Sequence, residues 1–344
     1  KMDLEENKSN VSLSGGNSFP VTSLKIKKYN NVSLKTKIFE KERYFYFNDN
    51  DKEIPYDYNK ILVNVHWGQL KLFMSEFFTF IYHLDLESVD VLYIGAAPGD
   101  HIYVLAQLFD NFHYHLYDTQ KFDSRLKELT NVTIYPKYFD DIELEKWKKK
   151  DRCVLISDIR TLSYNPGGFS KDSQRINEES VWSDMCLQQK WVEELNPHLS
   201  LLKFRLPFAY DFILKQGKTR RYLDGLVLRQ VYNKPTSSET RLLVSEIDHK
   251  QWDIVSYERK LAYHNDKIRT QKFLNPMNES ETPIYKKKGL LNDFDSSYFC
   301  VLVIDFLNSI GETPDEENVK NIMDFIIDNM SSKKSNLLSK RAGF

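Results

Sequence analysis

Short runs of β-branched and aromatic residues alternate with helical stretches through the middle of the chain. Five strand-like runs span residues 91–94, 112–117, 132–135, 154–157 and 200–206. A long amphipathic pattern over residues 173–195, ended by Asn196-Pro197, precedes the last run and predicts a helix. Alternation of this kind is typical of a parallel sheet covered by helices. The pattern therefore predicts an α/β fold with a mostly parallel sheet.

Two further strand-like runs follow, over residues 226–231 and 242–247. The polar turn that joins them, residues 233–238, is too short for a helical crossover. We therefore expect these two strands to be antiparallel to each other.

Three apolar segments lie outside the predicted sheet. Apolar residues recur at steps of three and four over residues 70–84, which predicts a helix with Gln69 and Lys71 near its start. The aromatic cluster at residues 44–47 either docks on the core or offers a surface for stacking. The apolar stretch 298–306 is expected to pack internally, with a partner interface as the alternative.

Both ends of the chain are poor in large apolar residues. Residues 1–21 are rich in Asn, Ser, Gly and Lys, and the tail over residues 331–344 is similarly polar. Such segments cannot bury enough surface to offset their ordering entropy, so both are predicted to be disordered. Residues 22–330 are left as a single domain with an N-terminal extension.

Charge and cysteine content narrow the classes of function. Lys and Arg number 48 against 49 Asp and Glu, so any nucleic-acid site must be a local patch. The basic runs at residues 215–221 and 286–288 are candidates, with a solvated surface as the alternative. The three cysteines, Cys153, Cys186 and Cys300, form no CxxC pair, which argues against a zinc knuckle and a disulfide framework. A reducing, intracellular location without membrane insertion is expected.

The most informative segment is a strand, a turn of small residues and a helix start. It reads Val91-Leu92-Tyr93-Ile94-Gly95-Ala96-Ala97-Pro98-Gly99-Asp100-His101. Small residues let a ligand approach the backbone, and a helix N-terminus favours an anionic group. A plain strand-to-helix turn is the alternative. The spacing is not GxGxxG, and the next strand is followed by Asp118, which can accept both hydroxyls of a ribose. Nicotinamide dinucleotides and S-adenosylmethionine (AdoMet) both contain such a ribose, and Gly-x-Ala-Pro-Gly favours AdoMet.

Four charged residues lie in or beside predicted elements. Lys71 lies on the first predicted helix, Asp158 follows the fourth strand, Lys203 lies in the fifth strand, and Glu239 precedes the last strand. Strand ends of an open α/β sheet converge on one edge, so these groups can meet beside the AdoMet site. Each of them taken alone is an ordinary salt-bridge residue.

This combination resembles the FtsJ-like RNA 2′-O-ribose methyltransferases, which use a K-D-K-E tetrad. Within that family the chain is most similar to the poxvirus cap-specific 2′-O-methyltransferases, which are also the small stimulatory subunits of viral poly(A) polymerases. The residues that carry the resemblance run in the family's order over positions 44–265: 68–72, 91–101, 155–158 with Arg160, 202–205 with Pro207-Phe208, Glu239 with 241–243, and 257–260. The resemblance implies a Rossmann-like AdoMet-dependent methyltransferase fold, with a seven-stranded sheet, an antiparallel last strand and helices on both faces.

The resemblance also implies a set of AdoMet contacts. They are Gln69, Gly95, Ala97, Pro98, Gly99, His101, Asp118, Lys137, Phe139 and Asp158. Gln69 would contact the methionine end, Asp118 the ribose, and the region around Lys137 the adenine. For Phe139, a place in the core is an equal alternative.

The expected reaction is attack of a ribose 2′-hydroxyl on the AdoMet methyl group. Lys203 is the candidate to accept or steer the hydroxyl proton, and partial burial beside the cation Lys71 would leave a usable fraction of it neutral. Asp158 and Glu239 would hold the two lysines in place. The mechanism needs no metal.

A methylated guanine cap carries a positive charge, so two aromatic faces would attract it by cation–π interaction as well as stacking. Tyr56 and Phe208 stand where the family has its stacking rings, and Glu258 matches the carboxylate that reads the guanine edge. Arg205 and, less securely aligned, Asp211 complete the predicted cap site. The family has a further Tyr where this chain has Thr236-Ser237-Ser238, which leaves one wall of the site open to question.

The sequence thus predicts a virus-encoded, cytoplasmic enzyme. Packaging of the enzyme in the virion is an open alternative. Its partners would be capped mRNA and a poly(A) polymerase catalytic subunit. Two alternatives stay open: a methyltransferase of uncapped RNA, and a non-catalytic RNA-binding subunit of the polymerase. Tyr56, Phe208 and Glu258 argue against the first alternative, and the complete tetrad argues against the second.

Overall fold

The computed structural model describes most of the chain from residue 45 to residue 330. The described ranges are 45–57, 66–84, 88–150, 152–161, 171–234, 236–280, 284, 290 and 293–330, with the backbone of Asn10–Val11 and Phe19–Pro20. The rest of residues 1–21, the tail 331–344 and the basic run 286–288 lie outside the described residues. The predicted domain boundaries therefore stay predictions.

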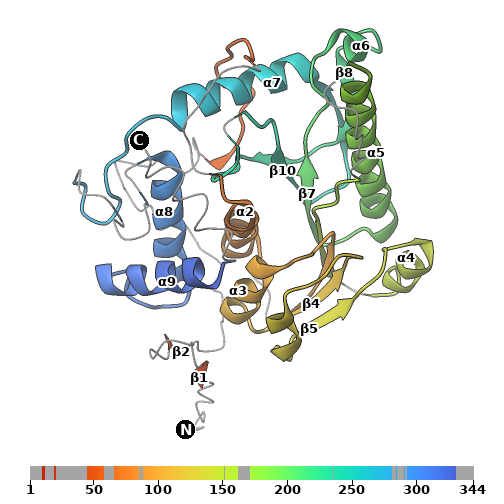
Figure 1. Cartoon of the computed structure of the whole chain (residues 1–344). Helices are drawn as coiled ribbons and strands as arrows, with labels where there is room; N and C mark the ends of the chain where they lie inside the picture. The colour runs from red at the N-terminus through yellow and green to blue at the C-terminus, as the bar shows by residue number, and fades with distance from the viewer. Residues whose placement is uncertain are drawn as a thin grey trace.

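A seven-stranded sheet forms the centre of the molecule (Figure 1). Its strands are β3 (Val89–Ile94), β4 (Phe112–Tyr117), β5 (Val132–Tyr135), β6 (Cys153–Ser157), β7 (Leu199–Phe204), β9 (Leu226–Leu228) and β10 (Thr240–Val244). They lie in the order β5-β4-β3-β6-β7-β10-β9. The first five are parallel, and β10 runs antiparallel to both β7 and β9. The predicted α/β fold and its antiparallel last strand are confirmed.

Helices cover both faces of this sheet. On one face lie α2 (Gly68–His83) and α3 (Asp100–Leu108), with α8 (Phe294–Ser309) and α9 (Glu316–Asn329) packed against them. On the other face lie α4 (Asp141–Trp147) and α5 (Lys171–Leu195), as Figure 1 shows. Among the described residues no helix is both long and apolar enough to cross a membrane.

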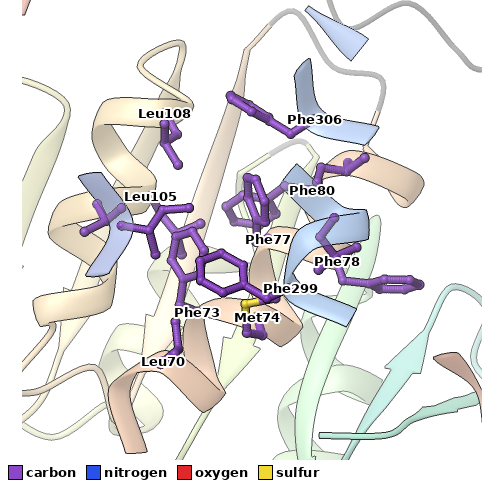
Figure 2. Packing of buried hydrophobic residues seen from close by; sticks show 14 of the residues in the cluster. Leu70, Phe73, Met74, Phe77, Phe78, Phe80, Leu105, Leu108, Phe299 and Phe306 are labelled. Carbon is purple, nitrogen blue, oxygen red and sulfur yellow. The ribbon is translucent and has the colours of Figure 1, made fainter. Parts of the chain in front are cut away.

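The alternation of side chains along the strands supplies two cores. Val91 and Tyr93 of β3 enter the core under α2 and α3, whereas Leu92 and Ile94 enter the core on the side of α5. Phenylalanines dominate the first core (Figure 2). There Phe73, Phe77, Phe78 and Phe80 of α2 meet Leu105 and Leu108 of α3 and Phe299 and Phe306 of α8.

Shorter elements complete the fold. A two-stranded antiparallel ribbon consists of β8 (Thr219–Leu223) and β11 (His249–Asp253). The others are η1 (Ser124–Glu128), α6 (Asp211–Leu214), α7 (Ile254–Tyr263), η2 (His264–Ile268) and the short pair β1 (Asn10–Val11) and β2 (Phe19–Pro20).

Two open questions from the sequence are answered by burial. The stretch 298–306 lies in α8 and almost all of its side chains are buried, so internal packing is confirmed for it. Of the aromatic cluster, Phe45 is buried against Phe78 and Tyr298 and thus docks on the core. We did not predict α9, β8 or β11 from the sequence.

Candidate active site

The turn after β3 requires glycine at both of its ends. Gly95 and Gly99 adopt positive φ angles of 82° and 81°. A Cβ atom on Gly95 would lie 2.9 Å from the backbone nitrogen of Ile159, so any side chain there would push the ends of β3 and β6 apart. The turn therefore brings the backbone of β3 against the strand that leads to Asp158.

Asp118, directly after β4, holds this turn from the neighbouring strand. One carboxylate oxygen accepts from the backbone N–H of Ala97 at 3.1 Å and the other from that of Gln120 at 2.8 Å. Each oxygen has a second acceptor position, so Asp118 can still accept ligand hydroxyls. Pro98, at the tip of the same turn, is exposed.

Gln69 and His101 lie together where α2 and α3 begin. The side-chain oxygen of Gln69 lies 2.8 Å from Nδ1 of His101, so the Gln69 amide nitrogen keeps its two N–H donors. The His101 ring itself is buried, with its Nε2 3.1 Å from the Tyr93 hydroxyl and 3.3 Å from a carboxylate oxygen of Glu76. The His101 ring is thus buried and contacts Gln69, Tyr93 and Glu76.

The residues after β5 divide between surface and core. The ammonium of Lys137 donates to Glu143 at 2.7 Å, and this bond, with that from Lys146, lowers the pKa of Glu143 to about 2. Phe139 is buried and makes edge contacts with Tyr117 and Trp191. The position of Phe139 therefore matches the alternative of a core residue.

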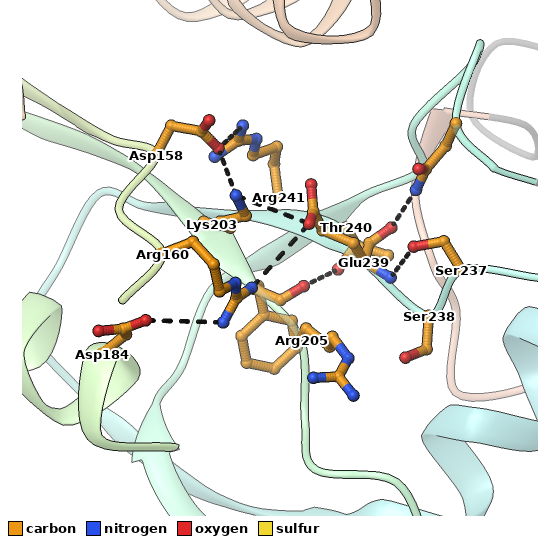
Figure 3. A network of polar contacts seen from close by, with 12 residues as sticks. Asp158, Arg160, Asp184, Lys203, Arg205, Ser237, Ser238, Glu239, Thr240 and Arg241 are labelled. Atoms are coloured by element: carbon orange, nitrogen blue, oxygen red, sulfur yellow. Dashed lines mark hydrogen bonds and ion pairs between the residues drawn. The ribbon is translucent and has the colours of Figure 1, made fainter. Parts of the chain in front are cut away.

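The four tetrad residues meet at the carboxyl edge of the sheet. Lys71 forms an ion pair with Glu239, and the ammonium of Lys203 lies 3.2 Å from an oxygen of Asp158 and 3.8 Å from an oxygen of Glu239. Figure 3 shows Lys203 between the two carboxylates. The four side chains are between 11% and 16% exposed, so bulk water screens these charges little.

Two arginines extend the network beyond the predicted tetrad. Arg241, on β10, is fully buried, donates to the backbone carbonyl of Ser157 at 3.1 Å and pairs with Asp158. Arg160 lies 3.9 Å from Glu239 and 3.8 Å from Asp184 (Figure 3). Sequence reasoning gave neither arginine a role, although a charge inside the apolar strand of Arg241 was a signal of a buried partner.

The network sets the protonation of its members. Burial alone would raise the pKa of both carboxyl groups, but the surrounding cations Lys203, Arg241 and Lys71 hold the pKa of Asp158 below its usual range. The pKa of Glu239 lies well below its usual range, because Lys71 and the same cations outweigh the effect of burial. Burial lowers the pKa of the Lys71 ammonium.

Cations outnumber carboxylates in this network. Four cations of the described chain contact only two carboxylates in this network, Asp158 and Glu239, besides the contact of Arg160 with Asp184. Loss of a proton from one lysine would bring the network closer to neutrality. Burial favours the neutral form of Lys71, and the excess of cations suits an anionic or developing-anionic substrate.

The two predicted stacking rings lie in contact at an angle. The centroids of Tyr56 and Phe208 are 5.4 Å apart and the ring planes are inclined by 57°. A base stacked between two rings needs their planes roughly 7 Å apart, since each pair of carbon surfaces separates by about 3.5 Å. The rings must therefore separate and become parallel before they can hold a base between them.

Two carboxylates hold the backbone beside Phe208. Glu178 of α5 accepts from the Phe208 N–H at 2.8 Å and pairs with Arg205, and Glu258 of α7 accepts from the Ala209 N–H at 2.8 Å. The sequence did not reveal Glu178. Asp211 lies exposed at the first residue of α6.

The loop before Glu239 meets Tyr56 through its backbone. The Tyr56 hydroxyl donates to the carbonyl oxygen of Thr236, the residue that stands in place of the family tyrosine. Burial, together with the charge of Glu258, raises the pKa of this hydroxyl, so Tyr56 stays a neutral donor. The Ser237 hydroxyl accepts from the Glu239 N–H at 3.1 Å, which ties the same loop to the tetrad.

The chain is similar to one protein family and to several viral proteins that have the same name. A family model described as "Poly A polymerase regulatory subunit" matches residues 38–325. A protein of fowlpox virus (strain NVSL) named "Cap-specific mRNA (nucleoside-2′-O-)-methyltransferase" is 33% identical over 256 residues, which cover 66% of this chain and 76% of that protein. A protein of the same name from myxoma virus (strain Lausanne) is 30% identical over 254 residues, covering 67% and 71%.

Among solved structures, VP4 of bluetongue virus, described as a multifunctional RNA-capping production line, resembles the chain with a TM-score of 0.40 and 11% sequence identity. That match covers 80% of this chain and 56% of the VP4 chain.

Proposed function

Because the chain belongs to the poly(A) polymerase regulatory subunit family, we propose that it methylates capped mRNA. It transfers a methyl group from AdoMet to the ribose 2′-hydroxyl of the first transcribed nucleotide of 7-methylguanosine-capped RNA. The observation that carries this proposal is the buried network of Lys71, Asp158, Lys203 and Glu239 at the sheet edge. The names of the viral relatives support the same reaction.

The residues around the glycine turn suit AdoMet. The amide N–H groups of Gln69 are donors for the methionine carboxylate, and Asp118 accepts from the ribose hydroxyls. Gly95 and Gly99 adopt positive φ angles, which fix the tight turn against which AdoMet would lie. AdoMet supplies an electrophilic methyl group when bound.

The tetrad prepares the hydroxyl for attack. We assign the role of proton acceptor to Lys203, whose ammonium lies 3.2 Å from Asp158 and 3.8 Å from Glu239. Asp158 and Glu239 fix the position of Lys203, and Glu239 also holds Lys71. General-base help of this kind is worth about 10²–10⁴ in rate, with further gains from alignment.

Cap recognition places the reacting ribose. Tyr56 and Phe208 separate to stack the methylated guanine, and Glu258 accepts from its N1–H and amine edge, as Asp211 does at the margin. Downstream phosphates would meet the exposed basic side chains of Lys215 and Lys218, which lie between α6 and β8, and of Arg221 on β8.

We expect the wild-type protein to bind 7-methylguanosine-capped RNA much more tightly than RNA with an unmethylated guanosine cap. Phe208→Ala should weaken binding of the methylated cap roughly ten- to a hundredfold, because one stacking face is lost. Titration of RNAs that differ only at the 5′ end measures both effects, and AdoMet binding by the variant serves as the folding control. Equal affinity of wild-type protein for the two caps would contradict cap recognition.

The position of the product and the 5′ end that the RNA needs distinguish this function from that of a methyltransferase of uncapped RNA. Labelled AdoMet should mark the ribose of the first transcribed nucleotide, and triphosphate-ended RNA should accept little label. Label on a base would overturn the reaction assigned to the tetrad.

A second role as processivity subunit of a viral poly(A) polymerase is favoured by the family that matches residues 38–325. The partner would be the catalytic subunit of that polymerase, in the cytoplasm of the infected cell and in the virion. A stable complex should bury at least about 1,200 Å² and survive gel filtration at micromolar concentration.

We expect the Lys203→Ala protein to lengthen poly(A) tails as well as wild type, because the tetrad lies at the sheet edge and serves only methyl transfer. The measurement is co-purification with the cognate catalytic subunit, followed by tail-length analysis. Failure of wild type to associate or to lengthen tails would leave the chain a methyltransferase only.

A further inference from the structure

The ring of Phe208 has a cation on one of its faces. The guanidinium carbon of Arg205 lies 4.3 Å over the ring centroid. At this distance the guanidinium fills that face, so a base can stack only on the other one. A 7-methylguanine on Phe208 would then have Arg205 roughly 8 Å away across the ring.

Two cations on opposite faces of one ring weaken each other's binding to that ring. Both are attracted by the same π-electron quadrupole, and they repel each other directly. Arg205 is 9% exposed, and a separation of roughly 8 Å does not exceed the Debye length at physiological ionic strength, so screening is incomplete. An uncompensated Arg205 would therefore weaken binding of the charged, methylated base relative to neutral guanine.

Glu178 is placed to remove this penalty. Its side chain is 3% exposed, and one carboxylate oxygen pairs with the Arg205 guanidinium. The other oxygen accepts from the backbone N–H of Phe208 at 2.8 Å. One buried carboxylate thus neutralises the cation and fixes the backbone of the ring that the cation covers.

We infer that Glu178 is a positioning residue that determines the preference for the methylated cap. It contacts Arg205 and Phe208, and through them it keeps the far face of the ring free of net positive charge. The inference rests on the proposed function, because it assumes that Phe208 stacks the cap. A purely structural role would instead weaken binding of both cap forms to the same degree.

The chain offers a matched control at the next position. Glu179 is exposed on the same helix and pairs with Arg175 at 2.9 Å on the surface. Glu179→Gln removes the same charge as Glu178→Gln from the same helix, but not from the side chain that contacts Arg205.

The experiment measures the ratio of KM values for RNA with an unmethylated and a methylated guanosine cap, in the full chain. Glu178→Gln should reduce this ratio at least about tenfold, whereas Glu179→Gln should leave it unchanged. The double variant Glu178→Gln/Arg205→Met replaces the buried ion pair by a neutral pair and should regain the wild-type ratio, whatever its absolute affinity.

The outcomes separate this inference from the proposed function. No cap preference in wild type would overturn the proposed function. A clear wild-type preference that Glu178→Gln retains would overturn the role of Glu178 alone. If Glu178→Gln does not fold, the double variant decides: loss of cap preference in a folded double variant would contradict the electrostatic account, and retention would support it.

Discussion

Lys203→Ala is expected to lower kcat by at least about a hundredfold while AdoMet still binds. Lys203 is the only lysine of the described chain in contact with both Asp158 and Glu239, at 3.2 Å and 3.8 Å. Its removal takes away the proposed proton acceptor, and losing a general base costs about 10²–10⁴ in rate. Single-turnover methyl transfer with capped RNA, with AdoMet affinity measured alongside, tests this.

Lys203→Arg distinguishes proton transfer from electrostatic stabilisation. Arginine keeps the positive charge and can pair with both carboxylates, but it cannot lose its proton in a protein. We therefore expect Lys203→Arg to be impaired at least about a hundredfold as well. A well-folded Lys203→Arg protein with near-normal kcat would show that the charge of Lys203 suffices, and would remove its role as a base. Lys190→Ala, at an exposed surface ion pair, serves as the control.

The central sheet was predictable because its signals are local. Strands β4 and β5 begin and end at the residues that the apolar runs indicate, and β3, β6 and β7 differ from the predicted runs by one or two residues at their ends. Buried parallel strands are nearly continuous apolar runs, so their residues alone mark them. The antiparallel pairing of β9 with β10 followed from the length of one turn.

The tetrad was predictable for a topological reason. The carboxyl ends of parallel strands meet at one edge, so residues placed after β6, within β7 and before β10 had to converge. Their ion pairs in the structure show that Lys71, Asp158, Lys203 and Glu239 do come together. Their roles in catalysis remain the proposal that the Lys203 variants test.

Partners that lie far apart in the sequence could not be predicted. Glu178 and Arg205 are 27 positions apart, and Arg241 is 83 positions from Asp158. The helical period puts Glu178 on the same face as Val181 and Met185, but nothing in it indicates that its partner is Arg205. The helix α9 is a different case, because its apolar residues recur at helical spacing; only its packing against α8 and α3 depends on residues far away in the sequence.

The cap site illustrates a different limit. The sequence placed Tyr56 and Phe208 as opposed rings, and the structure brings them within 5.4 Å. A resemblance can indicate which side chains meet, but the spacing and tilt of two rings depend on the contacts behind them. Here those contacts are the Tyr56 hydroxyl on Thr236 and the Arg205 guanidinium on Phe208.

Arg241→Met is expected to destabilise the folded protein by about 3–5 kcal/mol. The guanidinium is 1% exposed, and its loss takes the side-chain donor from the Ser157 carbonyl and one of two cations from the same oxygen of Asp158, which keeps only Lys203 at 3.2 Å. Breaking a buried ion pair by removing one partner costs about this much, because the remaining charge stays desolvated. Urea unfolding followed by tryptophan fluorescence measures it, and Arg221→Met, at an exposed position, should stay within about 0.5 kcal/mol of wild type.

The destabilisation should also depend on pH in a defined direction. Burial raises the pKa of Asp158, but Lys203, Arg241 and Lys71 bring it below its usual range. A carboxyl group with a depressed folded pKa stabilises the protein above its unfolded pKa, and that contribution is lost as the pH falls through the folded pKa. Without Arg241 only Lys203 and Lys71 lower the folded pKa of Asp158, so this pKa rises and the variant protonates Asp158 at a higher pH than wild type does. The difference in unfolding free energy between wild type and Arg241→Met should therefore be smaller near about pH 4 than near about pH 7. A difference that stays constant or grows on acidification would show that the loss comes from packing rather than from the charge on Asp158.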